Sequence, residues 1–145
     1  MLAQRLSLAA LMLLILAACA QDKGAILSAP EAYARAQAGT LTLVDIRHAD
    51  EWRQTGVVPG ALRVDMTETQ GETGFARQVE AALNGNKNTP IGLLSLAGNR
   101  GANAQQVLRE AGFTHVYNIK EGMLGSGDGP GWIARGLPMQ ACPDC

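Results

Sequence analysis

"LVDIRHADEWRQTGVVPGALRVDM", residues 43–66, contains an apolar run, a polar stretch that ends in glycine, and a second apolar run. The first run predicts a strand over 41–46, and the polar stretch predicts a helix over 48–56. The second run predicts another strand over 61–65. A helix between two strands is typical of a parallel sheet, because parallel strands need a crossover connection.

The same alternation of helices and strands continues on both sides of this stretch. Residues 28–39 predict a helix, with Ser28 as its N-cap, Glu31 completing a capping box and Gly39 at its end. We therefore predict one doubly wound α/β domain, with a parallel sheet covered by helices on both faces. The remaining predicted helices cover 75–85 and 101–112, the remaining strands 90–95 and 114–119, and one or two final helical turns 131–136.

Composition limits both the size of the fold and the class of partner. A chain of 145 residues, 47% of them hydrophobic, can build one domain with a full core and leaves no room for a second. The formal net charge of -1 provides no basic field that could hold nucleic acid. Nucleic-acid binding is therefore not expected.

The N-terminal stretch has the layout of a secretory signal, with one positive residue, Arg5, before an apolar run over 8–18. This run is shorter than a typical transmembrane helix. Its end, Leu16-Ala17-Ala18-Cys19, resembles the bacterial lipobox. There the peptide is cut before the cysteine, and the thiol takes a diacylglycerol.

The resemblance to a lipobox implies a signal peptide over 1–18, lipidation of Cys19 and a tether over 19–27. The protein would then be anchored in the bacterial cell envelope and face the periplasm or the exterior. Ala20 replaces the aspartate that retains some lipoproteins in the inner membrane, so the choice of membrane stays open. The alternative is a plain signal peptide and a soluble periplasmic protein.

Polar residues follow two of the predicted strands, at the end where ligands bind in open parallel sheets. Asp45 and Arg47 follow the first strand, and "SLAGNRG", Ser95–Gly101, follows the strand over 90–95. A loop of small residues between a strand and a helix presents backbone N–H groups that can bind an anion. The Ser95 loop is the better candidate site.

Several motifs resemble a rhodanese domain in their order and spacing. They are Asp45-x-Arg47, the pair Glu51-Trp52, the turn Gly56-Val57-Val58-Pro59-Gly60-Ala61, and "LLSLAGNRGANAQQVLREAGFTHVYNIKEGMLG" over 93–125. The resemblance implies a single rhodanese-like domain over 28–138. From the residues themselves we interpret Asp45 and Arg47 as a support of the site that braces a strand-helix turn, with Arg47 facing Glu51 four residues on.

The resemblance also implies what the loop has lost. In active rhodaneses a Cys-x-x-Gly-x-Arg loop stabilises a thiolate and the persulfide that it carries. Gly98 and Arg100 match this pattern, but Ser95 replaces the cysteine, and a serine cannot form a persulfide. Leu96 and Val57 replace polar residues that are usual in active members. The backbone remains suited to a small oxyanion such as sulfate or thiosulfate, bound by the loop residues Leu96, Ala97, Gly98, Asn99 and Arg100.

Ser95 could act as another kind of nucleophile only with a histidine beside it. His48 follows its strand at the same rim as the loop, whereas His115 begins a strand at the opposite rim. No oriented triad is evident in the sequence. We therefore interpret Ser95 as a small residue that satisfies its own loop, and we do not expect a serine hydrolase.

The tail over 139–145, "MQACPDC", carries a second candidate site. Cys142 and Cys145 are predicted to form a disulfide in an oxidising compartment. Two alternatives stay open: thiols that carry sulfur or electrons, and a soft metal site for Cu(I) or Zn that includes Met139. No basic residue follows Cys142, and Asp144 and the terminal carboxylate disfavour a thiolate by like-charge repulsion. The tail is predicted to be mobile.

The sequence thus favours an exported binding module, without a cofactor, that holds a small oxyanion, a sulfur compound or a protein segment without turnover. The alternative is a sulfurtransferase or thiol-disulfide oxidoreductase that uses Cys142 and Cys145.

Overall fold

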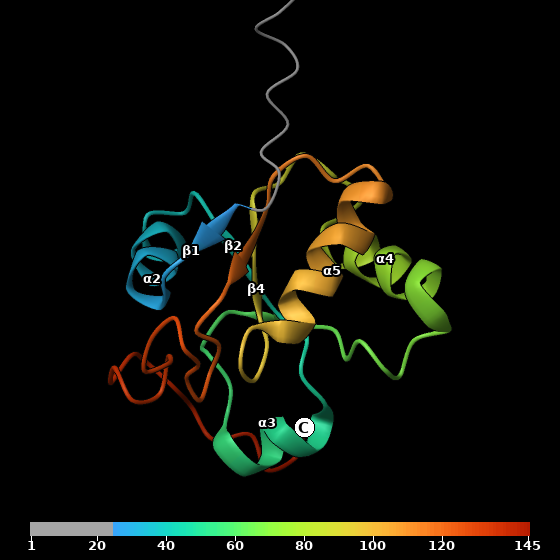
Figure 1. The fold of residues 1–145 in the computed structure, drawn as a ribbon. Coiled ribbons are helices and arrows are strands. Elements are labelled where there is room, and N and C mark those ends of the chain that lie inside the picture. The colour runs from blue at the N-terminus through green and yellow to red at the C-terminus, as the bar shows by residue number, and fades with distance from the viewer. Residues whose placement is uncertain (1–24) are drawn as a thin grey trace, which may run out of the picture.

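Five parallel strands form one sheet in the order β1-β5-β4-β2-β3 (Figure 1). This computed structural model describes residues 25–145 of the chain. The central strand β4 is buried on both faces, as its run of apolar residues predicts. The parallel α/β class predicted from the sequence is confirmed. The strands are β1 (Ile26–Leu27), β2 (Thr42–Asp45), β3 (Leu62–Arg63), β4 (Ile91–Leu94) and β5 (Val116–Ile119).

Helices cover both faces of the sheet. Helices α4 and α5 lie on one face and α2 lies on the other, while α3 lies beyond the carboxyl end of β2 (Figure 1). Successive strand residues alternate between the two apolar clusters: Leu93 packs with α4 and α5, and Leu94 packs on the side of α2. The helices are α2 (Ala29–Gln37), α3 (Ala49–Thr55), α4 (Gly71–Ala82) and α5 (Asn99–Glu110).

The described domain begins before Ser28, at the short edge strand β1. The sequence predicts a tether over 19–27, but Leu27 is buried in the apolar cluster beside α2. The carbonyl of Ala25 accepts the N–H of Asn118 at 3.0 Å and the side-chain amide of Gln105 at 2.8 Å. A strand of two residues has no periodicity of its own and forms only because β5 pairs with it.

The start of α2 differs from a closed capping box. The Ser28 hydroxyl accepts the Glu31 N–H at 3.3 Å, as predicted, but the Glu31 carboxylate pairs with Arg35 one turn later. A carboxylate far along the chain, Glu121, accepts the N–H of Ala29 at 2.7 Å instead. The helix end is thus satisfied by a tertiary contact.

Two other segments predicted to be helical differ only in extent. The helix predicted over 75–85 begins one turn earlier, at Gly71, and the segment 131–136 forms a single turn, in which the Arg135 N–H donates to the Gly131 carbonyl at 3.1 Å. Trp132 is fully buried there and meets the ring of Tyr33 edge to face. Burial of this indole beside α2 fixes the position of the segment.

Residues 25–145 contain no helix that is both long and apolar enough to cross a membrane. The predicted signal peptide and lipidated Cys19 lie outside the described residues.

Candidate functional site

Strand β4 ends at Leu94, and the chain turns from Ser95 into α5. The Ser95 side chain is fully buried, and its hydroxyl accepts the Gly98 N–H at 3.0 Å. Gly98 has φ +87°, and a Cβ on it would lie 1.9 Å from the carbonyl oxygen of Lys120. Glycine is therefore required both for the turn and for the close approach of the neighbouring segment.

The segment after β5 and a side chain on β5 hold this loop. Met123 donates its N–H to the Ser95 carbonyl, and Leu124 donates to the Leu96 carbonyl, both at 2.9 Å. The side-chain amide of Asn118 donates to the Gly98 carbonyl at 3.1 Å. Asn118 is a loop-holding residue that is absent from the predicted site, although a polar residue in an otherwise apolar strand is a signal for such a role.

Two backbone amides of the loop have no hydrogen-bond acceptor among residues 25–145. These are the N–H groups of Leu96 and Ala97, both half-buried, at the point where α5 begins. They adjoin the free N–H groups of the first turn of α5 and the positive end of its dipole. This arrangement can accept an anion.

The loop arginine, Arg100, is already paired with a carboxylate from α3. Its Nη1 and Nη2 donate to the two oxygens of Glu51 at 2.8 and 2.6 Å. The Glu51 carboxylate also accepts the His48 N–H at 2.8 Å. Burial acts to raise the pKa of Glu51, but the hydrogen bonds from Arg100 and His48 and the Arg100 charge outweigh it and lower this pKa.

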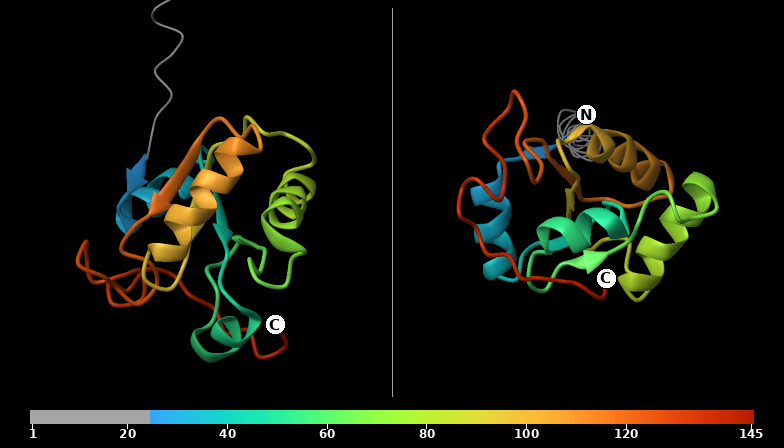
Figure 2. Two further views of the ribbon diagram at one scale, coloured as in Figure 1. Left: turned by 45° about the vertical axis from the view of Figure 1, so that its right-hand side comes forward. Right: turned by 90° about the horizontal axis from the view of Figure 1, so that it is seen from below.

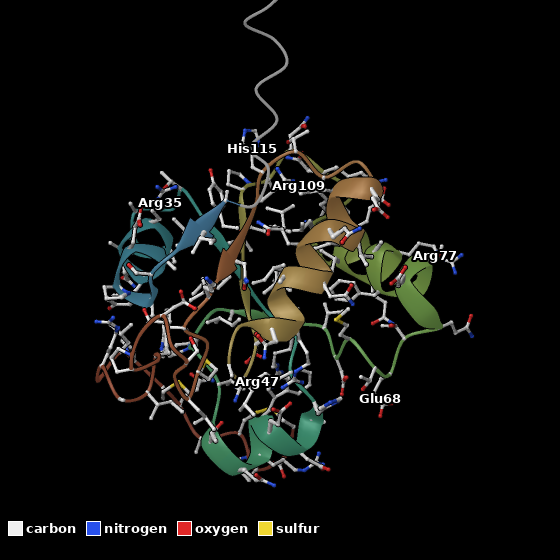
Figure 3. All side chains as sticks on the ribbon, in the orientation of Figure 1. Arg35, Arg47, Glu68, Arg77, Arg109 and His115 are labelled. Carbon is white, nitrogen blue, oxygen red and sulfur yellow. A yellow bond between two sulfur atoms is a disulfide. The ribbon has the colours of Figure 1, made fainter. Side chains whose placement is uncertain are left out.

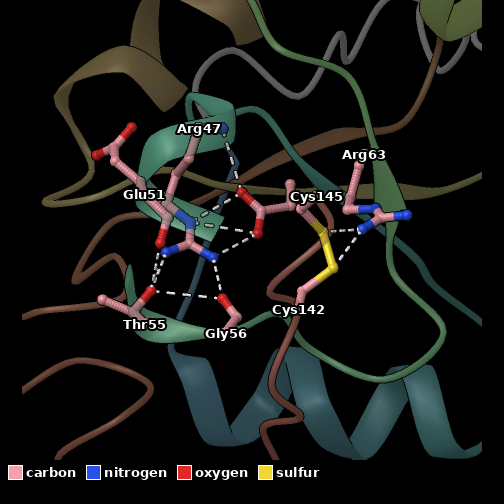
Figure 4. Close-up of a disulfide and its surroundings, with 8 residues drawn as sticks. Arg47, Glu51, Thr55, Gly56, Arg63, Cys142 and Cys145 are labelled. Carbon is pink, nitrogen blue, oxygen red and sulfur yellow. Dashed lines mark hydrogen bonds and ion pairs between the residues drawn. A yellow bond between two sulfur atoms is a disulfide. The ribbon is translucent and has the colours of Figure 1, made fainter. Parts of the chain in front are cut away.

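The prediction that Arg47 faces Glu51 is wrong. Arg47 and Asp45 are both fully buried, and the guanidinium donates to the two Asp45 oxygens at distances from 2.7 to 3.2 Å (Figure 4). Arg47 also donates to the Thr55 hydroxyl at 2.7 Å and to the Gly56 carbonyl at 2.9 Å. These bonds join the end of β2 to the end of α3, so the pair braces this turn as the sequence predicts.

Neither histidine contacts Ser95. The Nδ1 atom of His48 lies 2.8 Å from the Thr67 hydroxyl and 3.3 Å from a carboxylate oxygen of Asp65. His115 lies at the opposite end of the sheet from Arg47, as Figure 3 shows. Among residues 25–145, the Gly98 amide is the one hydrogen-bond partner of the Ser95 hydroxyl.

The C-terminal tail lies against the turn after α3 (Figure 2). Gln140 and Val57 exchange two backbone hydrogen bonds of 2.9 Å each, so the tail is docked in place, whereas the sequence predicts a mobile one. A Cβ on Gly56 would lie 2.5 Å from the Gln140 carbonyl oxygen, so this glycine also makes room for the tail. Met139 packs against the apolar cluster beside α2.

Cys142 and Cys145 are joined by a disulfide, with their Cα atoms 5.4 Å apart. Arg63 on β3 points at this disulfide, and its Nη1 donates to Cys142 Sγ at 2.9 Å and also to Cys145 Sγ (Figure 4). Arg63 is absent from the predicted site, because no local signal in the sequence joins residues 79 positions apart. Residues 25–145 contain no cluster of three or more His, Cys, Asp or Glu side chains that could hold a metal ion.

Comparisons with known proteins identify relatives of this chain. The sequence model described as "Rhodanese-like domain" matches residues 28–125. The uncharacterized protein RP600 of Rickettsia prowazekii is 29% identical over 100 residues, which cover 68% of this chain and 81% of that protein.

Two solved structures show the same architecture. The polysulfide-sulfur transferase of Wolinella succinogenes is 26% identical, with a TM-score of 0.62, and the alignment covers 86% of this chain and 83% of that one. Protein Rv0390 of M. tuberculosis is 28% identical, with a TM-score of 0.63 and coverage of 82% and 98%. Together with the family match over more than half of its length, these likenesses show that the chain belongs to the rhodanese-like domain family.

Proposed function

We propose that this chain is an exported rhodanese-like domain whose loop over 95–100 binds a small sulfur anion without transferring its sulfur. In this proposal Ser95 stands where active members carry the cysteine that receives sulfur. The supporting observation is that a buried hydroxyl, bonded to the Gly98 amide, lies at the end of β4. A hydroxyl cannot form a persulfide, and activation of a serine would need a base beside it.

In this proposal the unbonded amides of the loop supply the anion site. The N–H groups of Leu96 and Ala97 have no acceptor among residues 25–145, and the N-terminus of α5, two residues further on, adds the positive end of its dipole. Arg100 adds little net charge there, because Glu51 neutralises it. Binding is therefore expected to be weak, with a Kd on the order of 1 mM.

The class of ligand comes from the chemistry of the loop and from one relative. The Wolinella succinogenes relative is, by its name, a polysulfide-sulfur transferase. We extend this to the present chain as a ligand class, thiosulfate or a short polysulfide. The lipobox resemblance at Cys19 adds the proposal that the domain meets this ligand at the bacterial cell envelope.

Thiosulfate titration of the full chain in detergent, followed by calorimetry, tests binding. The change Glu51→Gln leaves Arg100 without its anionic partner, so we expect about tenfold tighter binding, which corresponds to about 1.4 kcal/mol. Glu110→Gln, which removes an exposed carboxylate at the far end of α5, is the matched control and should bind as the wild type does. Absence of binding in both the wild type and Glu51→Gln contradicts the proposed site.

Transfer of sulfur from thiosulfate to cyanide tests the absence of turnover. We expect no thiocyanate from the wild type, and a rate at least about tenfold above background from Ser95→Cys, because the backbone that stabilises a thiolate is still present. Ser95→Ala is the control for the substitution itself. Wild-type turnover that persists after Cys142 and Cys145 are both replaced by serine contradicts the proposal.

A further inference from the structure

We propose that Cys142 and Cys145 form a redox-active disulfide that exchanges with thiols, and that Arg63 stabilises the thiolate released when the disulfide opens. This activity is separate from anion binding at the loop over 95–100. It rests on the contacts of the tail with β3 and with the turn after α3.

The tail has a fixed place on the domain. Gln140 forms two backbone hydrogen bonds with Val57, in the turn after α3. Arg47 holds that turn by donating to the Gly56 carbonyl. The two sulfur atoms therefore lie at one defined position, beside the exposed end of β3. Both cysteines are half-buried, so a thiol in solution can reach them.

Arg63 is held where a thiolate would form. Its guanidinium lies over the ring of Trp52, with 5.7 Å between Cζ and the ring centroid, and its Nη1 reaches both sulfurs. An uncharged disulfide gains little from a guanidinium, whereas a thiolate gains a charge-assisted hydrogen bond. Arg63 therefore stabilises the reduced form more than the oxidised form.

A purely structural role explains the cysteines poorly. They are three positions apart, so the bond closes a very small loop and restricts few conformations of the unfolded chain. Both cysteines lie in the tail, so the disulfide does not fasten the tail to the rest of the domain. The bridge between Gln140 and Val57 does that. The pair is better explained by chemistry at the sulfur atoms.

The exchange needs a thiol co-reactant, either a small molecule or a protein dithiol. A thiolate attacks one sulfur and forms a mixed disulfide as the Cys142–Cys145 bond breaks, and the electron pair of that bond passes to the other sulfur. Since the Arg63 Nη1 reaches both, either sulfur leaves as a thiolate beside the same guanidinium. A second thiolate resolves the mixed disulfide. Overall, two thiols are oxidised to a disulfide and the tail gains two electrons.

Equilibration of the full chain in detergent with mixtures of reduced and oxidised dithiothreitol measures the equilibrium constant for reduction. The redox state is read by alkylation and mass spectrometry of the peptide 136–145, which excludes Cys19.

We expect Arg63→Met to disfavour reduction by about tenfold, which corresponds to about 30 mV for a two-electron couple. Arg63→Lys, which keeps the charge, should recover part of this change. Arg53 is an exposed residue of α3 that pairs with Asp50, so Arg53→Met removes the same charge without a sulfur contact and should change the constant less than about twofold.

Alkylation of the reduced wild type against pH is the second measurement, and it needs no variant. We expect a midpoint about one pH unit below 8.5, the usual range for a free thiol, because the Arg63 guanidinium that touches both sulfurs outweighs the like charge of Asp144. A midpoint at or above about 8.5, or equal equilibrium constants for the wild type and Arg63→Met, overturns the proposal. The anion titration at the Ser95 loop uses other residues, so the two proposals fail separately.

Discussion

Three arginines at the carboxyl end of the sheet do three different things, and their partners decide which. Arg47 is fully buried and braces a turn through Asp45, so its charge is not available to a ligand. Arg100 lies in the loop but is neutralised by Glu51. Arg63 is exposed, and it reaches the two sulfurs of the tail. The residue type alone distinguishes none of these roles.

Gly98 carries the tightest backbone contact of the loop, and the change Gly98→Ala tests it. A Cβ there would clash with Lys120 in addition to the strain of a positive φ, so we expect a loss of at least about 3 kcal/mol in the free energy of unfolding. Gly60 has a similar φ, +79°, but a Cβ added there would meet nothing within 4 Å, so Gly60→Ala should cost only about 1 kcal/mol. Urea denaturation measures both. Equal losses contradict the close contact with Lys120.

At the scale of elements, Glu121 joins α2 to the C-terminal segment. Its buried carboxylate accepts the N–H groups of Ala29 and Gly131 at 2.7 and 2.9 Å and pairs with Arg135 at 2.7 Å. Burial acts to raise the pKa of Glu121, but the hydrogen bond from Arg135, those from the two amides and the Arg135 charge outweigh it and lower this pKa. The ionised carboxylate thus holds the first turn of α2.

Stability should therefore depend on pH through Glu121. A carboxylate with a lowered pKa contributes fully above the pKa of the unfolded chain, about 4.3, and this contribution is lost as the pH falls through the folded pKa. We expect Glu121→Gln to reduce the free energy of unfolding by about 2–3 kcal/mol at pH 7 and to flatten its decline between pH 5 and pH 3. Glu31→Gln, in an exposed pair with Arg35, should change stability by less than about 0.5 kcal/mol. A decline as steep in Glu121→Gln as in the wild type contradicts this role.

At the scale of the whole molecule, the carboxyl end of the sheet brings together segments from most of the chain. The end of β2, the loop after β4, helix α3 and the tail all lie at this end (Figure 1). The opposite end carries His115 (Figure 3). Both proposed activities therefore lie on one side of the domain, as expected for an open parallel sheet.

The proposed anchor can be tested on the intact protein. Two acyl chains on Cys19 hold a protein stably in a membrane, so the native chain from a bacterial host should partition into the detergent phase of a phase-separation assay. Cys19→Ser should remain in the aqueous phase or keep its leader. Mass spectrometry of the mature N-terminus checks the position of cleavage. A native chain in the aqueous phase, with its N-terminus elsewhere, contradicts the anchor.

The sequence by itself determined the α/β class, the parallel sheet, most helix and strand positions, and the loop over 95–100. These features depend on local periodicity, because each helix or strand must bury one face or both. Glycines also mark turns locally, as Gly56 does at the end of α3.

Only the tertiary structure decided which charges meet. Arg100 pairs with Glu51 across 49 positions, Arg63 reaches Cys142 across 79, and β1 forms because β5 lies beside it. A prediction from sequence spacing uses only residues that are close along the chain. It therefore pairs Glu51 with Arg47 and finds no cation for the tail. Coulomb and hydrogen-bond energies depend on distance in space, and the folded sheet sets that distance.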